Sequence, residues 1–289
     1  MIYFPIFGAL SLATGTLLEK VILTKKNISA KAFQSASFIG IVIIMLPFLA
    51  FFWKLTPEAT TTKNILIFFL VVAFSLLANY FAFSALKSGK LSKIEPAKMT
   101  EPLFVVLIAL IFSYLIDSNM YERNFQMVIP AIIAGFAIVF SHVKKHHLKF
   151  NKCFSFALIG SFFFALELVI SRLILDFYSP ISFYFLRCLA VAVGSLFIFR
   201  PNFSSFDKKS NVLILLTAAI WVIYRIIVYY GYTTLGIVET TLIIMLGPIF
   251  IYLFAWKFLK EKISKRNIIA SIVILASVLY GIFAWRITL

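Results

Sequence analysis

Apolar and polar residues follow one another along the chain in long blocks. The sequence contains ten apolar stretches, each followed by a short polar segment. A bilayer core about 30 Å thick is crossed by a helix of about 20 apolar residues. The pattern predicts an all-α integral membrane protein with about ten transmembrane helices and no soluble domain. The expected spans are 2–22, 33–53, 65–86, 99–116, 125–143, 154–175, 180–199, 211–231, 238–257 and 267–286.

The composition supports this fold class. Hydrophobic residues make up 62% of the chain and charged residues 13%, whereas about a quarter of a soluble domain is charged. Cys153 and Cys188 lie in or beside apolar stretches, so we expect small buried thiols and no disulfide framework. The first span follows Met1 almost at once and is longer than the apolar core of a signal peptide, so we expect no cleaved leader.

Basic residues are distributed unevenly between the loops. Of the 27 lysines and arginines, 20 lie in or beside the odd-numbered loops, four in the even-numbered loops or at the ends, and three inside spans. Cytoplasmic loops of membrane proteins are enriched in Lys and Arg. We therefore interpret the net charge of +16 as a topology signal and not as nucleic-acid binding. It places the basic loops in the cytoplasm and both termini outside the cell.

The longest basic run, residues 142–152, divides the chain into two halves. Its three histidines, His142, His146 and His147, have no nearby cysteine or acidic residue. We interpret them as part of a solvated linker and expect no metal site. The predicted organisation is a five-helix repeat at 1–143, a basic linker at 144–153 and a second five-helix repeat at 154–289.

The two halves share a pattern of non-apolar positions. Pro102 and Pro248 align near the start of a span, and each of these spans ends at an acidic residue, Asp117 or Glu261. An Arg-Asn pair follows in both halves, and the first span of each half ends with a basic residue, as KVIL at 20–23 and RLIL at 172–175. Because each repeat has an odd number of spans, the second must enter the membrane from the opposite side. Many secondary transporters use such inverted repeats.

These features resemble the drug/metabolite transporter superfamily and, within it, the ten-helix EamA-type transporters. The resemblance covers nearly the whole chain and rests on the two repeats, the aligned prolines, the acids Asp117 and Glu261, and the basic residues Lys20 and Arg172. It implies a carrier of small metabolites, often amino acids or related compounds, frequently moved outward. Similar transporters usually have both termini in the cytoplasm; here we follow the charge count, which favours the opposite orientation.

Ionisable and polar groups inside the spans are the candidates for a binding site, because such groups are costly in a membrane. They fall on helical faces at i, i+3 or i+4 spacing. The candidate substrate-binding residues are Glu19, Ser75, Asn79, Glu167, Arg187, Trp221, Arg225, Tyr229 and Tyr232. Pro102 and Pro248 are the candidate helix-breaking or gating residues.

Two interpretations of these residues stay open. In the functional one, the faces surround a central cavity, Arg225 binds a carboxylate or stacks on a planar group, and Glu167 takes up a proton or meets an ammonium group. In the structural one, Glu167, Arg187 and Arg225 pair with one another and fix the helices in place. We also expect Lys98 and Glu101 to form an ion pair near the start of their helix, and Glu239 to favour the N-terminus of its helix.

The predicted function is a secondary transporter that moves a small metabolite, an amino acid or related zwitterionic or amphipathic compound, by export through alternating access. The alternatives are a lipid flippase of the same fold and an intramembrane enzyme. An enzyme is disfavoured because the sequence has no HExxH, paired-Asp or GxSxG motif. We expect no cofactor and no nucleic-acid partner. The expected partners are a small-molecule substrate, the lipid bilayer and protons, and the expected state is a monomer in the plasma or inner membrane, with a homodimer as the alternative.

Overall fold

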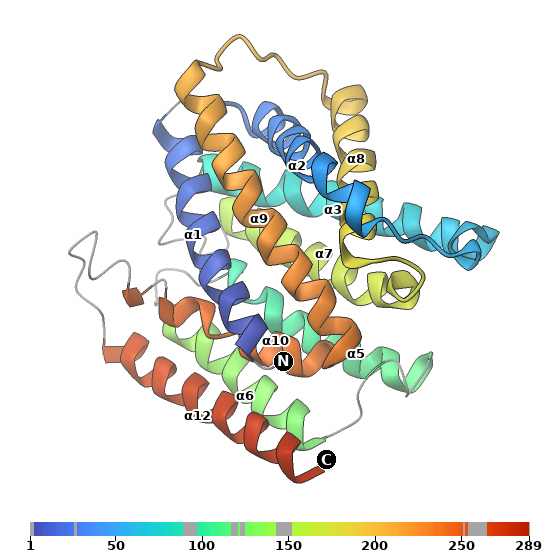
Figure 1. Cartoon of the computed structure of the whole chain (residues 1–289). Coiled ribbons are helices and arrows are strands. Elements are labelled where there is room, and N and C mark those ends of the chain that lie inside the picture. The colour runs from blue at the N-terminus through green and yellow to red at the C-terminus, as the bar shows by residue number, and fades with distance from the viewer. Residues whose placement is uncertain are drawn as a thin grey trace.

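The chain folds into a bundle of α-helices in a computed structural model, which describes residues 3–25, 28–88, 97–116, 121, 125–142, 152–250, 252–253 and 265–288 (Figure 1). The helices are α1 (Tyr3–Lys25), α2 (Ala30–Phe52), α3 (Thr62–Ser88), α5 (Glu101–Leu115), α6 (Phe125–His142), α7 (Lys152–Leu175), α8 (Pro180–Phe199), α9 (Lys208–Thr234), α10 (Ile237–Ile244) and α12 (Lys265–Thr288). A 3₁₀ turn, η1 (Pro57–Thr60), lies between α2 and α3. The predicted all-α fold class is confirmed.

Side-chain caps fix where several helices begin. Ser29 and Ser179 precede α2 and α8, and each hydroxyl accepts a hydrogen bond from a backbone N–H in the first turn of its helix. Asp207 does the same for α9 by accepting from the N–H of Ser210. Such caps satisfy N–H groups that have no partner within the helix. The spans predicted at 180–199 and 125–143 agree with α8 and α6 almost residue for residue.

Two helices are interrupted near the aligned prolines. Helical residues 97–98 are followed by a turn at Met99–Thr100, after which α5 begins at Glu101 and Pro102. In the second half, α10 ends at Ile244, a turn occupies residues 245–246, and helical structure resumes at 247–250. A proline lacks the N–H that an unbroken helix needs and fits its first turn. In the described part of the span predicted over 238–257, the interruption lies at Met245 and Leu246, two residues before the helix-breaking candidate Pro248.

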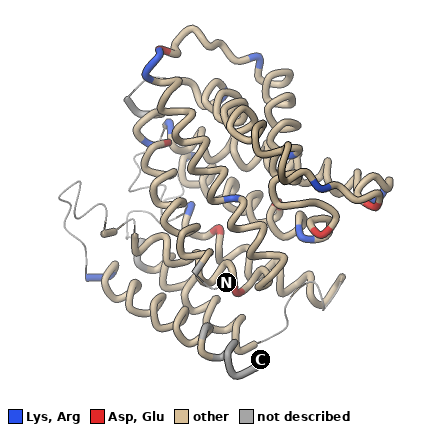
Figure 2. The backbone as a smooth tube through the Cα atoms, in the orientation of Figure 1, with Lys and Arg blue, Asp and Glu red and all other residues tan. Residues whose placement is uncertain are grey.

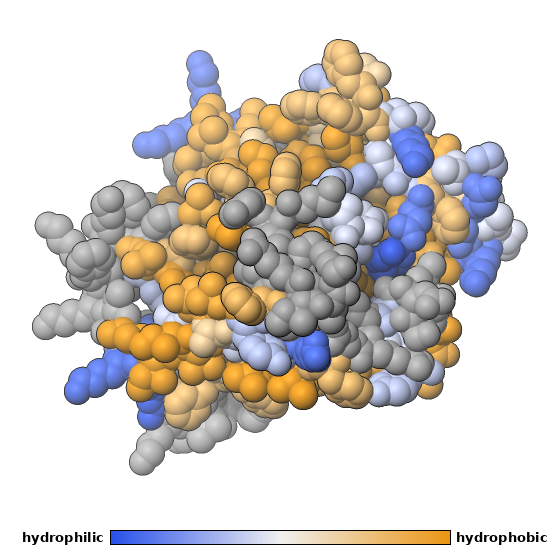
Figure 3. All heavy atoms as spheres, turned by 60° about the horizontal axis from the view of Figure 1, so that its bottom comes forward, coloured by the Kyte–Doolittle hydropathy of each residue, from blue (hydrophilic) through white to orange (hydrophobic). Residues whose placement is uncertain are grey.

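The helices have the length and surface of membrane spans. Six of them, α1, α2, α3, α7, α8 and α9, are long and apolar enough to cross a bilayer, and shorter apolar helices occur at Glu101–Leu115, Phe125–Phe140 and Ile237–Phe250. Large apolar side chains point outward, as Phe136 and Ile272 do with 58% and 63% of their surface exposed. Charged residues gather at the ends of helices (Figure 2), and apolar side chains dominate the face shown in Figure 3.

The two halves pack against each other in matched pairs. In the repeat, α1, α2, α3 and α5 correspond to α7, α8, α9 and α10. The contact of α1 with α9 then matches that of α7 with α3, and the contact of α2 with α9 matches that of α8 with α3. Likewise, α1 contacts α10 and α7 contacts α5. The remaining large contacts, α2 with α8 and α6 with α12, join equivalent helices. In Figure 1, α6 and α12 lie side by side at the edge of the bundle. Exchanging the first five helices for the last five thus preserves the main packing pattern.

Small residues allow the closest of these crossings. A Cβ atom added at Gly160 on α7 would lie 3.1 Å from the backbone nitrogen of Ala82 and 3.2 Å from the carbonyl oxygen of Ala78 on α3. Backbone atoms cannot move aside as a flexible side chain can, so any larger residue would crowd this crossing. Small residues commonly bring membrane helices together in this way.

Several predicted features lie outside the described residues. They are Asp117, Glu261, His146 and His147 and most of the basic linker. The described part of the predicted 144–153 linker, Lys152 and Cys153, belongs to α7. The repeat boundaries stay a prediction.

Candidate functional site

A cavity of about 120 Å³ lies between the two halves of the chain. Residues from α1, α2, α3, α5, α7, α8 and α9 line it, together with the two helix breaks. Seven of the residues proposed from the sequence reach this cavity: Glu19, Asn79, Pro102, Arg187, Trp221, Arg225 and Pro248. The predicted faces of α1, α3 and α9 therefore converge on one space.

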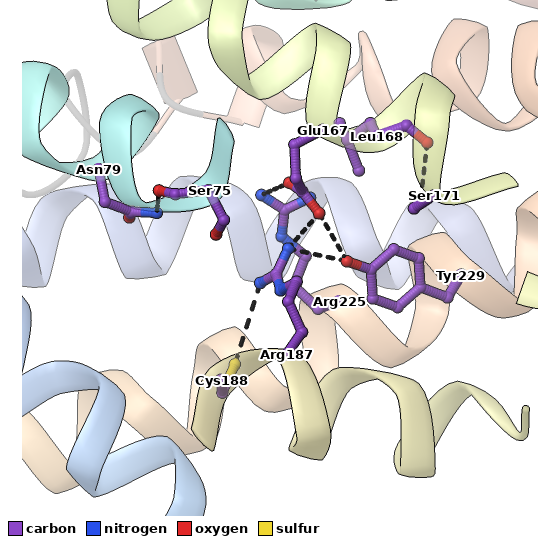
Figure 4. A network of polar contacts seen from close by, with 9 residues as sticks. All are labelled: Ser75, Asn79, Glu167, Leu168, Ser171, Arg187, Cys188, Arg225 and Tyr229. Carbon is purple, nitrogen blue, oxygen red and sulfur yellow. Dashed lines mark hydrogen bonds and ion pairs between the residues drawn. The ribbon is translucent and has the colours of Figure 1, made fainter. Parts of the chain in front are cut away.

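Glu167 lies behind the cavity, at the centre of a buried ion cluster (Figure 4). Its carboxylate oxygen Oε1 accepts hydrogen bonds from Arg187 Nη1 and, at 2.9 Å, from the hydroxyl of Tyr229. Arg187 Nη1 also donates to the Tyr229 hydroxyl at 2.8 Å. The cluster joins α7, α8 and α9, and neither charged side chain exposes more than 2% of its surface. A buried carboxylate is stable only when cations and donors surround it in this way.

Arg225 is held much less completely than Arg187. Its Nη2 lies 3.5 Å from Glu167 Oε2, too far and too poorly directed for a hydrogen bond, and its Nη1 is buried without a partner in the described part of the chain. The guanidinium stands over the rings of Phe164 and Tyr224, 5.7 Å from each centroid. Arg187, by contrast, bonds to Glu167 and Tyr229 and stacks on Tyr184 at 4.9 Å. Arg225 is thus a cavity cation with unused donors.

A second group of charges borders the cavity from the first half of the chain. Glu19, Lys98 and Glu101 all line it, and Lys98 acts electrostatically on both carboxylates. The predicted Lys98–Glu101 ion pair is wrong: no ion pair joins these two residues within the described ranges. Both side chains face the cavity instead, because the turn at Met99–Thr100 separates them and redirects the chain.

The other proposed residues lie in the protein interior, away from the cavity. Ser75 is fully buried, and its backbone carbonyl accepts a hydrogen bond from the Asn79 amide at 2.7 Å. The Tyr232 hydroxyl lies 3.4 Å from the hydroxyl of Thr241 on α10. Glu239 is in the first turn of α10, as expected. Glu167, Ser75, Tyr229 and Tyr232 therefore form the support of the site rather than its surface.

Aromatic residues that sequence reasoning did not place in the site form part of the cavity wall: Phe38, Tyr184 and Tyr224. Tyr224 follows Trp221 by three residues on α9 and packs against it, with ring centroids 5.2 Å apart. That spacing is a usable signal. No sequence signal reveals that Gly15 on α1 makes room for the indole, where an added Cβ would lie 3.2 Å from Trp221.

The described residues contain no group of three or more His, Cys, Asp and Glu side chains that could hold a metal ion. The polar groups of the cavity are carboxylates, cations, one amide and hydroxyls. This set binds and orients a polar ligand by charge and hydrogen bonds.

Comparisons with known proteins agree with this fold. Residues 151–282 match the family described as "EamA-like transporter family". A solved structure described only as "Crystal structure of protein" aligns with a TM-score of 0.66 and 16% identity, covering 99% of this chain and 97% of that chain. No curated protein matches the chain.

The fold and the cavity thus define a multi-pass membrane protein with a polar site between two matched sets of helices. The resemblance to the EamA-like transporters of the drug/metabolite transporter superfamily is confirmed, with the family match lying in the second half of the chain. That family is one of membrane transporters. At 16% identity, the solved structure shows the fold alone.

Proposed function

We propose that this protein is a secondary transporter that exports a small zwitterionic metabolite, an amino acid or a related compound, by alternating access. The observation that carries the proposal is the presence of charges of both signs around one buried cavity. Glu167, Arg187 and Arg225 have a formal surplus of one positive charge, whereas Glu19, Lys98 and Glu101 have a surplus of one negative charge.

This arrangement suits a ligand with one charge of each sign. A guanidinium binds a carboxylate through two parallel hydrogen bonds, and Arg225 has donors to offer. An ammonium group would find partners in Glu19 and Glu101, which line the same cavity. A ligand with a single charge would leave side chains of the other sign unmatched inside the membrane, where an unpaired charge is costly. The aromatic wall would hold the apolar part of the ligand.

The matched packing of the halves supports alternating access. In many secondary transporters the site lies near the membrane midplane, where interrupted helices of two inverted repeats meet, and the repeats rock around it. Here the breaks at 99–100 and 245–246 both border the cavity, through Met99 and Met245. Pro102 and Pro248 are the proposed gating positions, since each lies directly after its break.

The orientation of the protein is also a proposal. The excess of basic residues in the odd-numbered loops favours a cytoplasmic location for them, with both termini outside. A reporter enzyme that is active only in the cytoplasm, fused after Leu289, would be inactive in this orientation. An active fusion would reverse the assignment.

The function is tested by comparing the culture media of cells that express the native protein or Arg225→Ala, fed with amino acids and nucleobases. We expect an amino acid to accumulate outside only with the native protein. Arg172→Ala is the matched control, because Arg172 forms an i,i+4 pair with Asp176 at the end of α7, away from the cavity. Equal accumulation with native protein and Arg225→Ala, at equal membrane levels, would contradict the site. Movement of labelled lipid by the purified protein would instead favour a flippase.

A further inference from the structure

The two halves of the chain are joined at one end of the bundle by a small hydrogen-bonded clamp, formed by residues 52–56 after α2 and residues 177–182 at the start of α8. Leu55 and Tyr178 form an antiparallel bridge. The N–H of Thr56 donates to the Phe177 carbonyl at 3.0 Å, and the N–H of Ser179 donates to the Lys54 carbonyl at 3.1 Å.

Serine side chains complete the clamp. The Ser182 hydroxyl, which is fully buried, accepts a hydrogen bond from the N–H of Lys54 at 2.8 Å. The Ser179 hydroxyl donates to the Phe52 carbonyl at 2.6 Å. These bonds use backbone groups that a loop at a membrane surface would otherwise offer to water. The clamp therefore holds the end of α2 firmly against the start of α8.

Aromatic rings fill the space between the clamp and the ion cluster. The ring of Tyr178 packs against Phe183 with centroids 5.3 Å apart, and Phe183 packs against Tyr229 at 5.1 Å. Phe183 and Tyr229 are fully buried. The Tyr229 hydroxyl in turn donates a hydrogen bond to Glu167. Glu167 also forms an ion pair with Arg225, which lines the cavity. A continuous chain of contacts thus runs from the clamp to the donors of the site.

The equivalent segments at the other end of the bundle are not paired in this way. By the repeat, the counterparts of the clamp are the residues after α8 and those before α2. No backbone hydrogen bond joins residues 199–206 to residues 28–32, the parts of these segments that the structure describes. The ammonium of Lys31 lies over the ring of Phe199, at 5.8 Å from its centroid. Among the described residues, the two ends of the bundle are therefore joined differently.

We infer that the clamp is a closed gate of the transport cycle, and that it opens when the equivalent segments at the other end pair. This inference rests on the proposed alternating access. Tyr229 couples the substrate site to the clamp. A ligand that draws Arg225 away from Glu167 changes the charge next to the Tyr229 hydroxyl. The ring of Tyr229 packs on Phe183, which supports the clamp. The gate is the element of the cycle that the substrate site controls.

A disulfide tests whether the clamp must open. Bridge partners in antiparallel strands have Cα atoms about 4.5–5.5 Å apart, within the range that a disulfide spans. Leu55→Cys with Tyr178→Cys would be made with both native cysteines replaced by serine. We expect oxidation to reduce export of the identified amino acid at least tenfold and a reductant to restore it. Each single cysteine variant should be insensitive. Full export by the oxidised protein would overturn the gate.

A second measurement does not depend on knowing the substrate. Thr16 lines the cavity and is partly exposed, so Thr16→Cys reports access by a membrane-impermeant maleimide. In vesicles of both orientations, we expect labelling from the side opposite the clamp. Ser182→Ala should add labelling from the clamp side, several times above the native level. Ser195→Ala is the matched control, because Ser195 is also a fully buried serine of α8 and its hydroxyl has no hydrogen-bond partner among the described residues.

The two measurements separate the gate from the proposed function. If Ser182→Ala adds labelling from the clamp side but the native protein exports no amino acid, the gate is supported and the substrate assignment is wrong. If the native protein exports an amino acid and is already fully labelled from the clamp side, the gate is contradicted and the transporter function is supported.

Discussion

The two halves of this protein share a scaffold but carry different charged residues around the cavity. Aligning α3 with α9, which both have 27 residues, places Asn79 opposite Arg225. Aligning the capping serines Ser29 and Ser179 places Ser37 opposite Arg187, and aligning Lys20 with Arg172 places Gly15 opposite Glu167. At all three positions the second half carries a charge and the first half does not.

The reverse holds for the other group of charges. Glu19 corresponds to Ser171, and aligning the breaks at Met99 and Met245 places Lys98 opposite Ile244 and Glu101 opposite Gly247. The repeat thus preserves helix packing while each half has specialised in one sign of surplus charge. The comparison teaches that a duplicated fold can build an asymmetric site without changing its architecture, by substitution at matching positions.

The largest expected effect comes from removing the acid at the centre of the second-half cluster. Glu167→Gln leaves Arg187 and Arg225 without their shared counterion, and breaking a buried ion pair typically costs about 3–5 kcal/mol. We expect a large fall in melting temperature in detergent. Glu167→Gln combined with Arg187→Gln should recover part of this loss, since the two substitutions together remove one charge of each sign. If Glu167→Gln alone is as stable as the native protein, the ion cluster does not stabilise the fold.

Arg225→Asn makes the second half resemble the first at the position of Asn79. Because Arg225 makes no hydrogen bond in the described structure, we expect little change in stability. We expect loss of a charged hydrogen bond to substrate, worth about 1.5–3 kcal/mol, seen as a rise in KM of about tenfold or more. Uptake into proteoliposomes would measure it. An unchanged KM with a reduced melting temperature would favour the purely structural interpretation of Arg225.

Two glycines at matching positions sharpen the comparison of the crossings. A Cβ at Gly160 meets backbone atoms of α3, whereas a Cβ at Gly8 meets the Ile227 side chain at 3.0 Å. A side chain can turn aside and a backbone cannot. We expect Gly160→Ala to destabilise by about 1–3 kcal/mol, typical of overpacking, and Gly8→Ala to destabilise less. Melting curves of the two variants would show the order, and the opposite order would contradict it.

The smallest expected effect is that of Tyr229→Phe. The first half already has phenylalanine, Phe83, at the matching position of α3. The substitution keeps the ring packing and removes one hydroxyl that bonds to Glu167 and Arg187. We expect a loss of about 1–2 kcal/mol from a hydrogen bond to a charged group, measured by thermal unfolding. A loss as large as that in Glu167→Gln would mean that the hydroxyl, and not the counterion, dominates the cluster.

The helical scaffold could be predicted from sequence because the bilayer imposes one length on every span. The predicted 65–86 and 211–231 lie within α3 and α9, which extend only a few residues further. The breaks could be placed only approximately from Pro102 and Pro248, since a proline shows where a helix is weakened but not which residue unwinds. In the span predicted at 238–257, the turn lies at Met245 and Leu246, just before Pro248.

The candidate site could be predicted only as a set of residues. Charge within a span identified Glu167, Arg187 and Arg225, but helical periodicity alone does not show which of two buried faces meets the cavity. Glu167 therefore had the same standing as Arg225, although it lies behind the cavity and is already bonded to Arg187. Lys98 and Glu101 were expected to pair because a regular helix would bring them together, and the turn between them prevents it.

The balance of formal charge around the cavity has an electrical consequence. One set of residues has a surplus of one positive charge and the other a surplus of one negative charge, so the six groups sum to zero, and a bound zwitterion leaves the sum at zero. The membrane potential does work of about 2.3 kcal/mol per elementary charge per 100 mV only on net charge that moves. For the proposed zwitterionic substrate moved without a coupled ion, we therefore expect a transport rate that depends little on the membrane potential.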